Sequence, residues 1–247
     1  PFNTILFFIS IIKAYFFLRH NKINLLISTG GYMSLPFCIS AKILNIKIYL
    51  FEPNLVIGRS NKIFVRYSKK IFCYDKNIVG LPEKYQNKII LIKPILSNKI
   101  LNYKKKSSLN TKTKLKLLVL GGSQGAEFFD EIIEKIIEKL SKNTKIEIVQ
   151  QVHNKKKIDM LKNRYNKINI SNNVFSFDDN LIDKIQDCNL AITRCGASSL
   201  AELIQIKLPF IGIPFPFAKD NHQFFNAKYY EKKKLLLANR AKKFKNR

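Results

Sequence analysis

Apolar runs of strand length alternate with helix-like patterns along most of the chain. The clearest case is the run from Leu115 to Leu120, which precedes GGSQG and then residues 126–140, where Phe and Ile recur at three- and four-residue spacing. This order predicts a strand, a glycine turn and a helix. The same rhythm predicts strands at 23–28, 46–51, 70–74, 89–94, 145–150, 174–177, 208–213 and one ending at Thr193, with helices at 33–44 and 155–165. We therefore expect an α/β protein.

The first twenty residues are the only segment that resembles a membrane span. Lys13 interrupts its apolar run, which is short for a bilayer crossing. The segment also has neither a basic leading region nor a small-residue cleavage site, as a signal peptide would. We interpret it as a helix of the core or of a membrane surface, and we favour the core.

The pattern breaks between residues 101 and 114, which are polar, rich in lysine and without apolar periodicity. Such a composition is typical of an interdomain linker or a long exposed loop. The chain of 247 residues has room for two modest domains. We predict an N-terminal domain over 1–98, a linker over 99–114 and a C-terminal domain over 115–247.

The formal net charge of +27 suggests a polyanion or an anionic membrane surface as partner. The lysines are scattered through most loops of a sequence that is also rich in Ile and Asn, so we expect no nucleic-acid partner. The four cysteines fit neither a zinc pattern nor a disulfide framework. Because the three histidines are also far apart, we expect no metal site and no cofactor.

Three glycine turns follow predicted strands, namely Gly30–Gly31, Gly121–Gly125 and Gly196. Parallel sheets bind ligands at the carboxyl ends of their strands, and the N-terminus of the next helix attracts anions. GGSQG matches neither the dinucleotide fingerprint nor a P-loop, and each turn alone also fits a plain connection. The second and third turns at one sheet edge together favour a nucleotide diphosphate.

Two carboxylates near these turns each have two interpretations. Glu52 ends a predicted strand and is either a structural cap of the following turn or a catalytic or substrate-binding acid. Glu202 either accepts hydrogen bonds from ribose hydroxyls or forms a capping box with Ser198 or Ser199. The polar residues 220–223, at a loop–helix junction, fit either a sugar contact or an ordinary N-cap.

Four motifs stand in one order: GGYMSLP, GGSQGA, TRCGASSLAEL and LPFIGIPFPFAKDNHQFFNA. Together, from about Asn24 to Ala238, they resemble the MurG family of bacterial cell-wall glycosyltransferases. The resemblance implies the GT-B architecture, with two Rossmann-like domains that face a cleft. The first domain is expected to be incomplete, because the family's opening glycine-rich loop and its final helices are absent.

The resemblance also implies roles for particular residues. For the nucleotide donor, it implies that Ser123 and Gln124 contact the diphosphate and nucleotide and that Phe177 and Asp178 lie near the uracil. Ser198 and Ser199 would contact a phosphate, and Glu202 the ribose. The sugar would be contacted by His222, Gln223 and Asn226. On the acceptor side it implies substrate-binding roles for Gly30, Gly31 and Asn54, with Glu52 as the catalytic candidate.

The implied reaction transfers N-acetylglucosamine from UDP-GlcNAc to lipid-linked N-acetylmuramyl-pentapeptide with inversion. The acceptor's 4-hydroxyl attacks the anomeric carbon, UDP departs, and a base takes the hydroxyl proton. Helix termini at the diphosphate would stabilise the leaving charge. The implied partners are UDP-GlcNAc, the lipid-linked acceptor and the anionic inner-membrane surface, with the protein peripheral on its cytoplasmic face.

Departures from the family pattern keep other functions open. The family's HEQN-like loop reads FEPN at 51–54, and Leu96 replaces an arginine expected near the donor phosphate. One alternative is a non-catalytic or inactive fragment that retains nucleotide-sugar binding. The other is a related GT-B transferase that acts on a different lipid acceptor.

Overall fold

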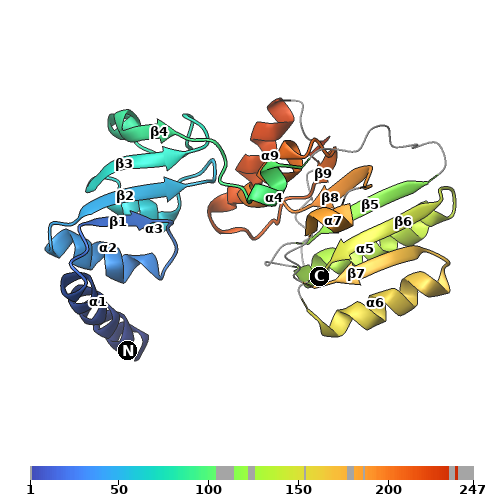
Figure 1. Cartoon of the computed structure of the whole chain (residues 1–247), viewed down its shortest axis with the longest axis horizontal. Helices are drawn as coiled ribbons and strands as arrows, with labels where there is room; N and C mark the ends of the chain where they lie inside the picture. Colours follow the sequence, from blue (N-terminus) through green and yellow to red (C-terminus); the bar gives the residue numbers. More distant parts are fainter. Residues whose placement is uncertain are drawn as a thin grey trace. The chain divides into compact units, whose positions relative to one another are not determined.

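The computed structural model describes residues 2–103, 114–121, 126–152, 154–176, 181–185, 187–233 and 237–238. The chain divides into two compact units, Pro1–Pro94 and Ile95–Arg247. Each unit contains one sheet in which every strand pair is parallel (Figure 1). The prediction of an α/β protein with two parallel-sheet units is confirmed.

The first unit has a four-stranded sheet in the order β1-β2-β3-β4. Its elements are α1 (Phe2–His20), β1 (Leu25–Ser28), α2 (Ser34–Ile43), β2 (Lys47–Glu52), α3 (Arg59–Phe64), β3 (Ser68–Cys73), the 3-10 turn η1 (Glu83–Lys88) and β4 (Ile89–Leu91). Strand β1 lies at the edge of the sheet and pairs with β2, so that Ser28 stands beside Leu50. The strand prediction is confirmed here, with ends that differ by up to three residues.

Helix α3 was not predicted, because its six residues carry two buried polar side chains and no apolar period. Ser60 and Asn61 are both buried, whereas Ile63 is 56% exposed. The hydrogen bonds of Ser60 and Asn61, rather than burial of apolar surface, account for the position of these two residues in the core. Lys88 closes the end of this helix by donating to the carbonyl oxygens of Val65, Arg66 and Ser68.

Helix α1 packs against α2 along one face only. Ala14 and Leu18 are buried in that contact, and the buried hydroxyl of Ser40 on α2 donates to the carbonyl of Ile11. The opposite face leaves large apolar side chains exposed, among them Phe8 at 60% and Phe16 at 64%. The interpretation of this segment as a core helix is therefore wrong for these residues. A helix that is apolar all round is normally buried all round, but α2 covers only one face of α1.

The second unit has a six-stranded sheet in the order β10-β9-β8-β5-β6-β7. Its elements are α4 (Asn98–Leu101), β5 (Leu115–Leu120), α5 (Ala126–Ser141), β6 (Ile146–Gln151), α6 (Lys156–Lys167), β7 (Ser171–Phe175), α7 (Leu181–Ile185), β8 (Leu190–Thr193), α8 (Ala197–Gln205), β9 (Phe210–Gly212), the 3-10 turn η2 (Lys219–Asn221), α9 (His222–Lys232) and β10 (Leu237–Ala238). The chain runs from β5 outward to β7, then crosses to β8 and continues outward on the other side.

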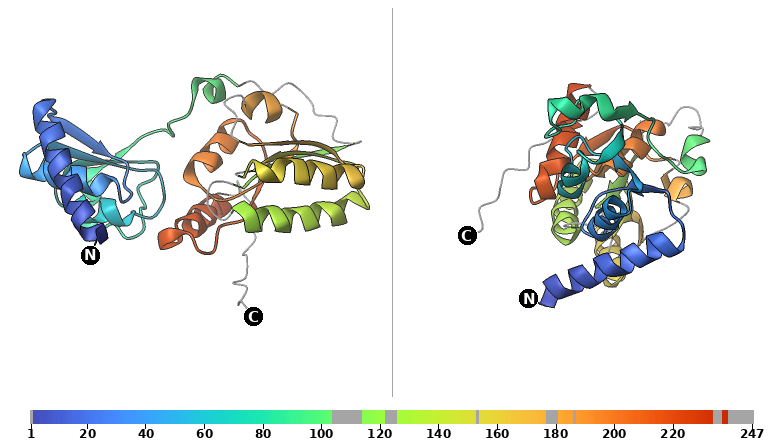
Figure 2. Two further views of the ribbon diagram at one scale, coloured as in Figure 1. Left: turned by 90° about the horizontal axis from the view of Figure 1, so that it is seen from below. Right: turned by 90° about the vertical axis from the view of Figure 1, so that its left-hand side faces the viewer.

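Two cores cover the two faces of this sheet. On one face, Phe129, Ile133 and Ile137 of α5 pack with side chains of α6. On the other, side chains of α7 and α8 pack against the sheet, with Leu200 of α8 fully buried, and Ala227 of α9 belongs to the same core. Figure 2 gives two further views of this unit. Helices on both faces of a parallel sheet are the doubly wound arrangement.

Strand β7 and the linker differ from their predicted boundaries. Strand β7 begins at Ser171, before the predicted start at 174, because its polar first half is held by main-chain pairing with β6. Part of the predicted linker forms α4, whose Ile100 is 5% exposed and packs in the core of the second unit. Residues 104–113 of that linker lie outside the described residues, so the predicted domain limits stay a prediction.

Candidate functional site

The second unit places its candidate site at the carboxyl edge of β5 and β8, where the winding of the sheet reverses. Leu120 and Thr193, the last residues of these strands, are direct neighbours in the register. The amide of Arg194 then donates to the carbonyl of Leu120, at 3.2 Å, and keeps the two chains together as they leave the sheet. Doubly wound sheets bind ligands in the crevice at such a reversal.

Arg194 is a buried cation at this edge, and it was not among the residues predicted from the sequence. It is 4% exposed, and its guanidinium carbon lies 4.5 Å from the centre of the Phe129 ring and 5.3 Å from that of Phe215. Its Nη1 donates to the carbonyl of Ile213. Burial lowers the pKa of Arg194 to about 10, so the group stays charged at neutral pH. The signal in the sequence was an arginine between an apolar strand and a glycine turn.

The turn after β8 delivers the chain into α8 without a side-chain cap. Gly196 is the N-cap residue, and within the described ranges no side chain makes a capping hydrogen bond at this end. Ser198 and Ser199 therefore lie inside the first turn, and the expectation that one of them caps the helix is wrong. Ser198 is exposed and Ser199 is half-buried. Their backbone N–H groups belong to the helix end that attracts anions.

Glu202 lies one turn further along α8 and is half-buried. Among the described residues it has no hydrogen-bonding or ionic partner, and burial alone raises its pKa. The helix begins at Ala197, so Glu202 stands too far from the cap to form a capping box. A half-buried carboxylate that has no partner in the described part of the chain suits a hydrogen bond from a ligand hydroxyl.

Helix α9 brings its predicted residues to the same turn. The amide of Asn226, which is 1% exposed, donates to the carbonyl of Cys195 at 3.1 Å. Gln223 is also buried and accepts the N–H of Phe215 in the loop after β9. His222 is half-buried, and its Nδ1 lies 2.7 Å from the carbonyl of Lys219. In the described structure Gln223 and Asn226 join α9 to the turns beside it.

Four predicted donor contacts cannot be placed. Ser123, Gln124, Phe177 and Asp178 lie outside the described residues. Their predicted roles stay predictions, as do the contacts predicted for Ser198, Ser199, Glu202, His222, Gln223 and Asn226.

The first unit has its own candidate site at the carboxyl ends of β1 and β2. Gly30 and Gly31 follow β1 with φ angles of +80° and +82°, a region that side chains other than glycine rarely adopt. A Cβ at Gly30 would lie 3.2 Å from Nδ2 of Asn61, whereas one at Gly31 would meet nothing within 4 Å. The turn is therefore packed on one side and open on the other.

Glu52 ends β2 beside this turn and is 3% exposed. Its Oε1 accepts the backbone N–H of Asn54 and the side-chain amide of the same residue, at 3.3 and 3.2 Å. Its Oε2 accepts the N–H of Gly58 at 2.8 Å and Nδ2 of Asn61 at 3.1 Å. Burial raises the pKa of Glu52 and outweighs the four hydrogen bonds, which lower it. The predicted catalytic role of Glu52 stays a prediction.

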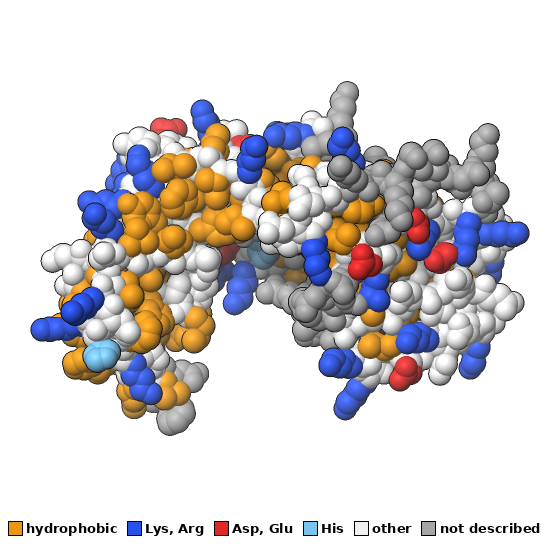
Figure 3. Space-filling model, in the orientation of Figure 1, with side chains coloured by type: hydrophobic (Ala, Val, Ile, Leu, Met, Phe, Trp, Pro, Cys, Tyr) orange, Lys and Arg blue, Asp and Glu red, His pale blue; other side chains and the backbone are white. Residues whose placement is uncertain are grey.

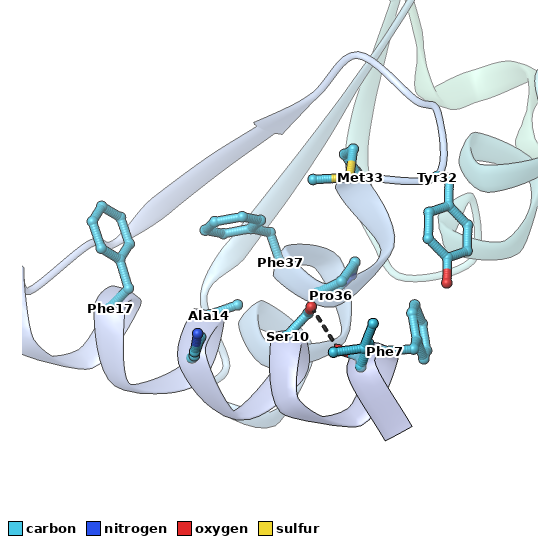
Figure 4. A pocket seen from close by; sticks show the side chains of 10 residues that line it. Phe7, Ser10, Ala14, Phe17, Tyr32, Met33, Pro36 and Phe37 are labelled. Carbon is cyan, nitrogen blue, oxygen red and sulfur yellow. Dashed lines mark hydrogen bonds between the residues drawn. The ribbon is translucent and has the colours of Figure 1, made fainter. Parts of the chain in front are cut away.

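An apolar groove of about 830 Å³ lies between α1 and the start of α2. Phe7, Ala14 and Phe17 line it from α1, and Tyr32 and Met33 face them from the turn before α2 (Figure 4). Figure 3 shows hydrophobic side chains gathered over α1, with lysine and arginine among them. Two of the apolar α1 side chains that line the groove, Leu6 and Phe17, are also exposed.

Within the described ranges, no three His, Cys, Asp or Glu side chains are grouped so that they could hold a metal ion. All four cysteines are buried and unpaired by disulfides. In the same ranges no helix is both long and apolar enough to cross a membrane.

Two family models match the chain. The model described as glycosyltransferase family 28 C-terminal domain covers residues 116–247, and the N-terminal domain model of the same family covers residues 1–73.

The chain is also similar to curated proteins named UDP-N-acetylglucosamine--N-acetylmuramyl-(pentapeptide) pyrophosphoryl-undecaprenol N-acetylglucosamine transferase. It is 47% identical over 232 residues to that of Pelagibacter ubique and 35% identical over 226 residues to that of Rickettsia canadensis. The matches cover 94% and 90% of this chain, which spans 64% of the length of each relative.

Among solved structures, the crystal structure of Acinetobacter baumannii MurG is similar with a TM-score of 0.72 and 22% identity, over 93% of this chain and 63% of that one. This similarity shows the GT-B fold, as expected from the sequence. With matches to both domain models, the chain belongs to glycosyltransferase family 28.

Proposed function

We propose that this chain takes part in the inverting transfer of N-acetylglucosamine from UDP-GlcNAc to lipid-linked N-acetylmuramyl-pentapeptide in peptidoglycan synthesis. The observation that carries the proposal is the 47% identity to the Pelagibacter ubique transferase, which extends through both units. Because the chain spans 64% of that relative, the activity of the whole relative is proposed for it rather than established.

The second unit binds the donor in this proposal. The N-terminus of α8 takes a phosphate group of UDP-GlcNAc, and the buried charge of Arg194 favours an anion at the same edge. Glu202 accepts hydrogen bonds from the ribose hydroxyls, a role supported by its lack of a partner among the described residues. His222, Gln223 and Asn226 contribute the sugar side of the pocket.

The first unit binds the acceptor. The open side of the Gly30–Gly31 turn admits the lipid-linked sugar, whose 4-hydroxyl attacks the anomeric carbon as UDP leaves. A base takes the hydroxyl proton, and fixed charge at the diphosphate lowers the cost of the leaving group. Glu52 is the predicted base, and its raised pKa is the direction that proton acceptance near neutral pH requires.

Helix α1 places the chain on the anionic cytoplasmic face of the inner membrane. Its exposed apolar side chains suit the acyl–headgroup boundary, and Lys13 and Arg19 on the same helix suit anionic lipids. The net charge of +27 adds a general attraction to such a surface.

The first test is a calorimetric titration of the chain with UDP-GlcNAc, with ADP-glucose as the control ligand. We expect saturable binding of the uridine donor only, weakened about tenfold by Glu202→Ala, since a hydrogen bond to a charged group contributes about 1.5–3 kcal/mol. Glu138→Ala, which removes an exposed carboxylate on α5, is the matched control and should bind as the unaltered chain does. Equal binding of both nucleotide sugars, or none by the folded chain, would contradict a UDP-GlcNAc site.

Transfer is tested separately by mixing the donor with the lipid-linked acceptor and following UDP release and the mass of the product. Donor binding without transfer would favour the inactive-fragment alternative. Transfer to another lipid acceptor, but not to the muramyl-pentapeptide lipid, would favour the related-transferase alternative.

Membrane association is tested by co-sedimentation with vesicles of phosphatidylglycerol and phosphatidylcholine. The double variant Phe8→Ser/Phe16→Ser should bind anionic vesicles more weakly, because about 25 cal/mol per Å² of apolar surface is no longer removed from water. Ile63→Ser, on a different exposed apolar position, is the control. Unchanged binding of the double variant would show that α1 does not carry the association.

A further inference from the structure

We propose that Ser60 and Asn61 on α3 are positioning residues for the acceptor. They join the glycine turn after β1 to the loop after β2, so that the two segments form one rigid binding surface. The inference rests on the acceptor role proposed for the first unit and adds two residues that neither the motifs nor the comparisons assign.

Asn61 is the central link and is 1% exposed. Its Nδ2 donates to the carbonyl of Phe51 and to Oε2 of Glu52, both at 3.1 Å. Its Oδ1 accepts the hydroxyl of Ser28 at 3.4 Å, and this hydroxyl oxygen in turn accepts the N–H of Gly30 at 3.2 Å. An unbroken series of hydrogen bonds therefore links Gly30 to Glu52 through Ser28 and Asn61.

Ser60 provides a second link to the same turn. Ser60 is 9% exposed, and its hydroxyl donates to the carbonyl of Gly31 at 2.7 Å. Adjacent residues of one helix therefore hold both glycines of the turn: Ser60 bonds the carbonyl of Gly31 directly, and Asn61 is linked to the N–H of Gly30 through Ser28. The lack of side chains allows this approach, since a Cβ at Gly30 would crowd Asn61.

Glu52 extends the network to the loop after β2. Its two oxygens hold Asn54 at the beginning of the loop and Gly58 at its end. A Cβ at Gly58 would lie 3.3 Å from Oε2, although the backbone there is an ordinary extended one. Gly58 therefore serves the close approach to the carboxylate, not an unusual backbone angle.

The hydrogen bonds of Ser60 and Asn61 hold segments of the protein in place and do not themselves contact a ligand. Ser60 and Asn61 direct their polar atoms into the protein, whereas the open face of the turn lies at Gly31. Both connected segments leave neighbouring parallel strands at their carboxyl ends, where α/β sheets bind ligands. Since small displacements of a binding segment reduce rates strongly, loosening this network should act on the acceptor and leave the donor site of the other unit unaffected.

The test measures steady-state transfer and backbone amide exchange for Asn61→Ala and Ser60→Ala, with Lys62→Ala as the exposed control on the same helix. We expect the KM for the acceptor to rise about tenfold or more in Asn61→Ala and less in Ser60→Ala. The KM for UDP-GlcNAc should stay within about twofold, and exchange at Gly30 and Gly58 should quicken together in Asn61→Ala. Where Asn61→Ala fails to fold, Ser60→Ala, which removes one hydrogen bond, carries the test.

Several results would overturn the inference. An unchanged acceptor KM, or an equal rise for both substrates, would reduce the network to general stability. A shifted pH profile of kcat with an unchanged acceptor KM would mean that Asn61 tunes the protonation of Glu52 instead. If the unaltered chain transfers no sugar, the proposed function is wrong, and the amide-exchange measurement still tests the network. Faster exchange in Asn61→Ala at only one of Gly30 and Gly58 would then show that the network does not couple the two segments.

Discussion

Glu52 is the last residue of strand β2, Glu202 lies on the helix that follows strand β8, and burial raises the pKa of each carboxyl group. Glu52 is 3% exposed, and its oxygens accept four hydrogen bonds from its own unit. Glu202 is half-buried and has no such partner among the described residues. The comparison teaches that one carboxylate is held by four donors of its own unit, whereas the other has no partner among the described residues, as a carboxylate that binds a ligand would.

The largest expected effect is on the stability of the first unit. Glu52→Ala leaves the buried amide of Asn61 and the N–H of Gly58 without their acceptor, so we expect a loss of about 2–4 kcal/mol in the free energy of unfolding. Glu202→Ala should change it by less than about 0.5 kcal/mol. Denaturant unfolding followed by amide exchange in each unit measures both. Equal losses would break the contrast between the two carboxylates.

A somewhat smaller effect is expected from the buried cation of the second unit. Arg194→Met keeps much of the packing between Phe129 and Phe215 but removes the charge, so the affinity for UDP should fall about 10- to 100-fold. Arg194→Lys should recover only part of it, because lysine lacks the planar guanidinium. Calorimetry with UDP checks this, and an unchanged affinity in Arg194→Met would show that the charge serves the fold alone.

Protonation of Glu202 should lower the affinity for the donor about tenfold, so the affinity should depend on pH. A carboxylate accepts ribose hydroxyls best when ionised, so donor affinity should be complete above the raised pKa of Glu202 and fall as the pH drops through it. Burial places that fall above pH 4.5, the ordinary value. In Glu202→Gln this part of the dependence should disappear. The same slope in both proteins would assign the titration to another group, such as the ligand phosphate.

The smallest effect separates the two glycine turns. Gly31→Ala forces a side chain into a φ of +82° and should cost about 1–2 kcal/mol through backbone strain, since its Cβ would meet open space. Gly196→Ala has an ordinary φ of −71° and the same open space, so a change below about 0.5 kcal/mol is expected. Thermal unfolding of the two variants provides the measurement. A larger loss at Gly196 would contradict this account of the turns.

The sequence predicted the strands and the long helices because their apolar residues follow simple periods. Leu115–Leu120, for example, is a strand with the predicted limits. Helix α3 and the polar start of β7 were missed, because hydrogen bonds rather than apolar burial hold them in place. The membrane-surface alternative for the first helix gained support over the favoured core interpretation, since packing on α2 covers one face only.

The sequence predicted where the candidate site residues lie, but not which hydrogen bonds and contacts surround them. The motifs indicated Glu52 and Glu202 alike, and only the fold distinguishes a carboxylate with four donors from one with none among the described residues. Asn61 and Arg194 carried no recognisable spacing. Their importance depends on contacts with Ser28 and Phe129, which are 33 and 65 residues away along the chain.

The edge position of β1 has a practical consequence for the isolated chain. Its outer main-chain groups are unpaired in the described sheet, and Leu25 and Ile27 are 43% and 56% exposed. Such an edge can template intermolecular strand pairing and aggregation. Mutual repulsion from the net charge of +27 opposes this, but only over a screening length of about 10 Å at 0.1 M salt. The chain should therefore stay monomeric longest in dilute buffer and precipitate as salt is added.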